Sequence, residues 1–185
     1  MQALTDDQFR RWSLGLRDGA RWAYAELFDA TYDPLLRYAV YITHDGDAAH
    51  DVLQDVFAKL WHIRATIDPE RSLKALLYQM VRNYALNHER YKKRHATDTL
   101  EDAAHELQHE ATTAAEMDAA RLNEQILRWI DAMPERRREA FMLSRYENLS
   151  HDEIARLMGL TPKTVNNHIV LALKYLREQL ERYQQ

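Results

Sequence analysis

Glycine and proline are scarce in this sequence, and their scarcity restricts the fold more than any other feature does. The 185 residues include only four glycines and four prolines. A protein made of many short strands needs these residues at its frequent tight turns. Helix-start signals and apolar residues at helical spacing occur instead along most of the chain. The sequence therefore predicts an all-α protein.

Composition also excludes several classes of protein. No stretch approaches the ~18 consecutive apolar residues of a membrane-spanning helix, and the first residues lack the apolar segment of a signal peptide. Cysteine is absent, which excludes disulfides and thiol catalysis. We therefore expect a cytoplasmic protein without membrane insertion.

Acidic charge is concentrated in one short segment, although the whole chain has a net charge of only −4. Residues 1–95 hold 14 basic and 13 acidic residues, residues 96–124 hold 1 and 8, and residues 125–185 hold 10 and 8. The acidic segment has few large apolar side chains and cannot build a core. We expect two small helical domains, 1–95 and 118–185, joined by an acidic linker at 96–117.

Capping residues predict helix boundaries in the first half of the chain. Thr5 and Gln8 have the spacing of a capping box, which opens a first helix. Asp33-Pro34 is typical of an N-cap and first turn, and predicts that another helix begins there. Turn residues predict breaks at 43–47 and 65–72, with long helices between and after them.

The last third of the chain has the pattern of a helix-turn-helix. Ser150 and Glu153 form a second capping box, which opens a short helix. Gly159 stands where a left-handed C-cap is required, and Thr161-Pro162 supplies the N-cap and first turn of the next helix. In DNA-binding proteins, the second helix of this motif enters the major groove.

The last helix is predicted to have one buried and one exposed side. Its apolar stripe contains Val165, Ile169, Ala172, Leu173, Leu176 and Leu180. The opposite side presents Lys163, Asn166, Asn167, Val170, Lys174 and Arg177, and Leu171 also points outward. Asparagine pairs with adenine edges, valine touches thymine methyls, and cationic side chains bind phosphates. This side is therefore predicted to bind duplex DNA.

Two helices before the linker are also two-sided. In 47–64, a buried stripe (Val52, Val56, Leu60, Ile63) opposes a polar stripe (Asp51, Asp55, Lys59, His62), with Gln54 at its flank. In the next helix, the core positions are Leu73, Leu76, Leu77, Met80, Val81 and Tyr84, so that Lys74, Arg82 and Lys93 face away. Residues 74–94 hold six basic residues and one acid, which suits a phosphate backbone. For Tyr78, Tyr84 and Tyr91 we expect core packing rather than base stacking.

Two parts of the chain together resemble a known family. DVLQDVFAKLW (51–61) and SLKALLYQMVRNYALNHERYKKR (72–94) resemble the second conserved region of bacterial sigma factors, most closely the small extracytoplasmic-function (ECF) group. Residues 134–180 are similar to the fourth region of that group, and the order of the regions also fits. The resemblance implies an alternative sigma factor that binds core RNA polymerase, recognises and opens promoter DNA, and is restrained by an anti-sigma factor.

The resemblance also implies roles for individual residues. Core polymerase would be bound through Asp51, Gln54, Asp55 and Trp61, since paired carboxylates beside an aromatic ring suit a basic partner surface. A loop at 68–72 would hold a flipped base, and the −10 element would be contacted by Asp68, Ser72, Lys74, Arg82, Asn83, Asn87, Arg90, Lys92, Lys93 and Arg94. The −35 element would be contacted by Thr161, Lys163, Thr164, Asn166, Asn167, His168, Val170, Lys174 and Arg177. Where the family commonly has arginines, this helix has Asn166-Asn167-His168 and Leu171.

Three other interpretations are based on particular motifs in the sequence. His105, Glu106 and His109 match the zinc-peptidase pattern H-E-x-x-H, but lie in the charged linker, where no apolar stripe forms a dry cleft. His50-Asp51 matches the paired ligands of helical phosphohydrolases. A regulator that works without polymerase would use the helix-turn-helix alone. We favour the sigma factor, with no catalytic residue, no cofactor and no metal.

Overall fold

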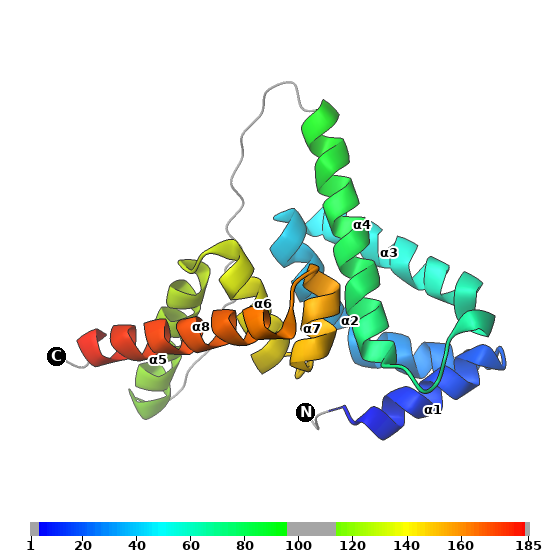
Figure 1. Ribbon diagram of the computed structural model, residues 1–185, viewed down its shortest axis with the longest axis horizontal. Helices are drawn as coiled ribbons and strands as arrows, with labels where there is room; N and C mark the ends of the chain where they lie inside the picture. Colours follow the sequence, from blue (N-terminus) through cyan, green and yellow to red (C-terminus); the bar gives the residue numbers. More distant parts are fainter. Residues whose placement is uncertain (1–3, 96–113, 184–185) are drawn as a thin grey trace. The chain divides into compact units, whose positions relative to one another are not determined.

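The computed structural model describes residues 4–95 and 114–183, which form eight α-helices and one short 3₁₀ helix, with no strand among them. The chain divides into two compact units, Met1–Ala103 and Ala104–Gln185 (Figure 1). The predicted all-α, two-domain class is confirmed. The limits of the predicted domains and linker stay a prediction.

The first unit is a bundle in which each helix buries one face. It contains α1 (Asp6–Arg17), α2 (Arg21–Thr43), α3 (Gly46–Ile63), η1 (Arg64–Thr66) and α4 (Leu73–His95). α2 packs against α1, α3 and α4, and α4 also packs against α3. The largest fully buried side chains are Leu16, Leu27, Leu35, Leu53, Val56, Leu60, Leu73, Leu77 and Val81. Burying each of them favours folding by about 1.5–3 kcal/mol.

The predicted capping box at the start of α1 is confirmed. The Gln8 amide donates to the Thr5 hydroxyl at 3.3 Å, and the Thr5 amide donates to the Gln8 side chain at 2.9 Å. The predicted breaks at 43–47 and 65–72 are also present. In the first of these, His44 adopts a left-handed conformation and Asp45 caps α3.

The predicted helix start at Asp33-Pro34 is wrong. α2 begins at Arg21 and continues through Pro34. Proline lacks the amide that would donate to the carbonyl four residues earlier, so α2 forgoes one backbone bond there. The fully buried Leu27 and Leu35, on either side of the break in the ladder, keep the same face of α2 in the core. Tertiary packing therefore outweighs the local start signal.

The second unit is built around its last helix. It contains α5 (Ala114–Asp131), α6 (Glu135–Arg145), α7 (His151–Met158) and α8 (Pro162–Tyr183), and α8 packs against the other three. One core cluster joins Ile130, Met133, Phe141 and Ala172. The predicted capping box at Ser150 is confirmed, and so is the left-handed C-cap at Gly159, whose φ is +66°.

The apolar stripe of α8 is only partly buried. Val165, Ile169 and Ala172 are buried as predicted, and Leu176 and Leu180 are half-buried. Leu173 is 39% exposed, so its predicted burial is wrong. Leu173 lies at the edge of the stripe, next to the exposed Lys174, where the packing of the neighbouring helices ends.

Gly15 marks a close approach of α1 and α2. A Cβ on Gly15 would lie 2.6 Å from the Cβ of Ala23 and 2.9 Å from the Trp22 ring. We expect Gly15→Ala to lower the free energy of unfolding of the first unit by about 1 kcal/mol, because overpacking exceeds the gain in helix propensity. The control is Gly46→Ala, whose Cβ would meet nothing within 4 Å. Urea denaturation measures both variants, and equal stabilities would contradict this packing.

Candidate nucleic-acid interface

The exposed side of α3 carries an acidic surface. Asp51, Gln54 and Asp55 are all exposed, opposite the buried Val52 and Val56. These positions follow from helical spacing, because residues three and four apart share a face. The predicted polar stripe of this helix is thus accessible to a partner.

Trp61 is held at the end of this surface and is half-buried. Its ring packs edge-on against Tyr24, with 5.3 Å between ring centroids. The Arg64 guanidinium lies 4.4 Å from the centroid of the Trp61 ring, and its Nη1 donates to the Trp61 carbonyl at 2.8 Å. The ring is therefore fixed in place rather than free to reorient.

The aromatic cluster that supports Trp61 was not predicted from the sequence. Tyr24, Phe28 and Tyr32 of α2 are half-buried and contact Phe57 of α3 with centroid separations of 6.2, 4.7 and 6.3 Å. Burial raises the pKa of Tyr24 above its ordinary value. The spacing of the three α2 aromatics at i, i+4 and i+8 was the signal available in the sequence.

The outward side of α4 is polar and basic over its second half. Arg90, Lys92, Lys93 and Arg94 are exposed, as are Asn87 about one turn earlier and Asn83 about two turns earlier. Arg90 Nη1 donates to Asn87 Oδ1 at 3.4 Å. This part of the helix therefore presents amides and cations side by side, the groups that contact base edges and phosphates.

Two cationic side chains of α4 are less exposed than predicted. Lys74 and Arg82 are half-buried. The Lys74 ammonium lies 5.9 Å from the centroid of the Phe9 ring, because α1 packs beside the start of α4.

The three α4 tyrosines have different environments. Tyr78 is 3% exposed, which confirms the predicted core packing, and Tyr84 is half-buried. Tyr91 is 66% exposed, so core packing is wrong for this residue. It lies in the last turns of α4, where residues 90–95 are all exposed.

The loop at 68–72 is held by short-range bonds and by an ion pair with α1. Asp68 Oδ1 accepts a hydrogen bond from the Glu70 amide at 3.0 Å, and Ser72 Oγ accepts one from the Ala75 amide at 3.1 Å, which caps α4. Arg10 of α1 bonds the Glu70 carboxylate at 2.6 Å. The loop that the sequence assigns to base binding is thus tied to the first helix.

We expect Arg10→Ala to loosen this loop. Without the Glu70 contact, hydrogen exchange of the amides in 68–72 should quicken roughly twofold or more, a modest change because exposed ion pairs are weak. The control is Arg17→Ala, which removes an exposed arginine from the last turn of the same helix. Unchanged exchange in Arg10→Ala would mean that the ion pair does not restrain the loop.

The exposed side of α8 carries most of the predicted duplex-binding residues. Lys163, Asn166, Asn167, Lys174 and Arg177 are exposed, and Val170 and Leu171 are 53% and 37% exposed. His168 and Thr164 are half-buried. The Thr161 hydroxyl accepts a hydrogen bond from the Thr164 amide at 3.2 Å, so Thr161 caps the helix.

Contacts from α6 fix the helix that precedes this surface. Arg136 Nη1 donates to the Met158 carbonyl, the last of α7, at 3.2 Å. The Leu160 amide donates to the Ala155 carbonyl at 2.8 Å, which closes the turn at Gly159. The start of α8 is therefore positioned by bonds at both ends of the turn.

The described residues offer no metal centre. Within 4–95 and 114–183, no group of three or more His, Asp or Glu side chains could hold a metal ion. His105, Glu106 and His109 lie outside the described residues. His50 faces the Tyr32 hydroxyl, with 2.8 Å between Nδ1 and the oxygen. In the same part of the chain, no helix is long and apolar enough to span a bilayer.

Comparisons with known proteins agree on one family. Models of "Sigma-70 region 2" and "Sigma-70, region 4" match residues 27–95 and 123–176. The RNA polymerase sigma-H factor of Pseudomonas aeruginosa is 27% identical over 186 residues, which cover 96% of each chain. The ECF RNA polymerase sigma factor SigL of Mycobacterium tuberculosis is 28% identical over 169 residues, covering 88% of this chain and 94% of SigL. The fold is similar to that of the sigma factor RpoE from Bartonella quintana, solved with the anti-sigma factor NepR: the TM-score is 0.66 at 19% identity, over 85% of this chain and 96% of the other.

Proposed function

The chain belongs to the ECF group of sigma-70 factors, and on that premise we propose which of its residues bind polymerase and promoter DNA. It is an alternative sigma factor that binds core RNA polymerase and directs promoter recognition and DNA opening. The observation that carries the residue assignments is the order of two helical units, each with a buried face and an exposed face of the required chemistry. The first unit binds polymerase and the −10 element, and the second binds the −35 element.

Polymerase docks on the exposed side of α3. Asp51 and Asp55 supply negative charge to a basic surface, and Gln54 supplies a donor and an acceptor between them. Trp61 is the anchor of this contact, because its ring is held by Tyr24 and Arg64 before the partner arrives. Charged residues around one rigid aromatic ring are a common composition for a binding hot spot.

The loop at 68–72 and the outward side of α4 hold the opened −10 strand. Unpaired bases expose their edges, which the Asn83 and Asn87 amides can bind. Phosphates beside them are held by Arg90, Lys92, Lys93 and Arg94. The −35 element is read as duplex by α8, with Asn166 and Asn167 near the start of the helix, where base contacts are usual.

The protein directs RNA polymerase to particular promoters and does not itself catalyse a reaction. It acts in the cytoplasm, where polymerase and promoters are. We further propose an anti-sigma factor as a regulatory partner, since the related RpoE structure is a complex with one.

Asp55→Arg should weaken binding to core polymerase about tenfold or more, because it places a cation against a basic partner surface. Trp61→Ala should weaken it similarly by removing the anchor. The control is Asp18→Arg, an equal change of charge at the exposed end of α1. Binding is measured by fluorescence anisotropy of labelled protein titrated with core enzyme, and circular dichroism checks the fold of each variant. Wild-type affinity in both Asp55→Arg and Trp61→Ala would refute the docking face.

Asn83→Ala and Asn167→Ala should each relax sequence preference at one promoter position, in the −10 and −35 elements respectively. Loss of a paired amide should change the ratio of preferred to altered base by roughly fivefold or more. Transcription from a library of randomised promoters measures the ratios, with Asn123→Ala on the exposed side of α5 as control. Unaltered promoter preferences in both variants would show that Asn83 and Asn167 do not contact bases.

A further inference from the structure

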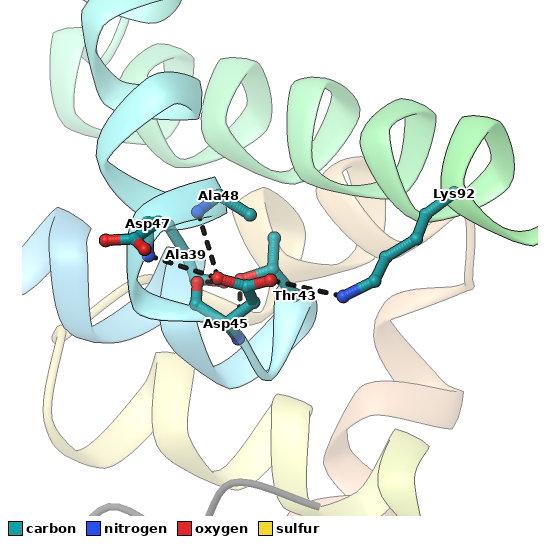
Figure 2. Close-up of polar contacts among 6 residues, drawn as sticks. All are labelled: Ala39, Thr43, Asp45, Asp47, Ala48 and Lys92. Atoms are coloured by element: carbon teal, nitrogen blue, oxygen red, sulfur yellow. Dashed lines mark hydrogen bonds and ion pairs between the residues drawn. The ribbon is translucent and has the colours of Figure 1, made fainter. Parts of the chain in front are cut away.

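Asp45 lies where the start of α3 meets the last turns of α4 (Figure 2). Its Oδ1 accepts hydrogen bonds from the amides of Asp47 at 3.1 Å and Ala48 at 3.2 Å. Its Oδ2 lies 3.1 Å from the Lys92 ammonium, which comes from 47 residues further along the chain. One carboxylate therefore caps α3 with one oxygen and pairs a cation of α4 with the other.

The negative charge of Asp45 is not needed for the cap. Asparagine and serine serve as N-caps about as well as aspartate. The backbone here is also fixed independently of the carboxylate. The Thr43 hydroxyl accepts a hydrogen bond from the Asp45 amide at 3.3 Å and shares its one proton between the Asp45 carbonyl at 2.9 Å and the Ala39 carbonyl at 3.0 Å. The charge is thus available for another role.

The ion pair with Asp45 distinguishes Lys92 from the neighbouring cations Lys93 and Arg94. Lys92, Lys93 and Arg94 are all exposed. Within residues 4–95 and 114–183, Lys92 is the one of the three that pairs with a carboxylate. An ammonium so close to a carboxylate attracts a phosphate weakly, since the carboxylate repels the phosphate from nearly the same distance.

We propose that Asp45 is a specificity-determining residue, which neutralises Lys92 and so lowers the affinity of the chain for DNA of any sequence. Binding then depends more on the neighbouring residues that read bases. The inference rests on the proposed function, in that it takes the basic end of α4 to bind DNA. Affinity for DNA of arbitrary sequence comes almost entirely from phosphate contacts, so one neutralised cation removes one contact.

The carboxylate stays charged at neutral pH, as this role requires. Hydrogen bonding from the Ala48 amide, followed by the bond with Lys92, lowers the pKa of Asp45 below its ordinary value. The pair is also accessible to solvent, with side chains 54% exposed for Lys92 and 36% for Asp45. DNA can therefore reach Lys92 without any rearrangement of the helices.

The test measures binding of the full-length protein to a labelled single-stranded DNA of mixed sequence over a range of salt concentrations. Asp45→Asn keeps an N-cap and removes the charge. It should bind about threefold tighter than wild type at low salt, with a slope of log affinity against log salt steeper by about 0.7, the value of one phosphate contact on a single strand. Asp47→Asn is the matched control, because Asp47 is an exposed acid in the same helical turn and should cause a smaller change. Thermal unfolding followed by circular dichroism verifies that the variants fold.

Lys92→Gln and the double variant Asp45→Asn/Lys92→Gln complete the cycle. Asp45→Asn should have no effect once Lys92 is absent. Wild-type affinity for Asp45→Asn, equal effects of Asp45→Asn and Asp47→Asn, or an effect that persists without Lys92 would each overturn the proposal. If Lys92→Gln leaves affinity unchanged even when Asp45 is asparagine, Lys92 makes no phosphate contact. The proposed −10 role of Lys92 then fails, separately from the effect of Asp45.

Discussion

Burial of one side of α4 is the constraint on which the first unit depends. Leu73, Leu77 and Val81 lie at nearly zero exposure against α2 and α3, so the rotation of this helix about its axis is fixed. Each turn of the buried stripe then determines which residues of that turn face solvent. The amides at Asn83 and Asn87 are exposed for that reason, whereas the cations after them are exposed because this end of α4 lies beyond the core.

Burial of one side also fixes the orientation of α8 in the second unit. Val165, Ile169 and Ala172 anchor the helix, and the opposite side, which is proposed to read duplex DNA, is left clear. The turn before α8 is fixed by its capping residues and by Arg136, so the residues at the start of the helix are presented rigidly. In both units a rigid core holds a polar face, so the backbone that carries this face needs little ordering when DNA binds.

Much of this arrangement could be predicted from the sequence because it is local. Capping boxes at Thr5 and Ser150 and the left-handed glycine at Gly159 involve residues at most a few positions apart. The polar and apolar sides of α3 and α8 followed from helical period alone, with an error at Leu173, where the stripe ends.

What the sequence could not predict depends on contacts between distant segments. Pro34 has the local pattern of a helix start, and only the packing of α2 on both sides of it shows that the helix continues. Tyr91 has core spacing but lies beyond the end of the core. The pair of Asp45 and Lys92, and that of Arg10 and Glu70, join helices whose relative positions no pattern within either segment specifies.

The central claim is that this chain makes core RNA polymerase start at particular promoters. Run-off transcription with purified core enzyme on a library of genomic fragments tests it most directly. Discrete transcripts that share sequence upstream of their start sites, and that form only when the protein is added, are the predicted result. No initiation above that of core enzyme alone on any fragment would contradict the account.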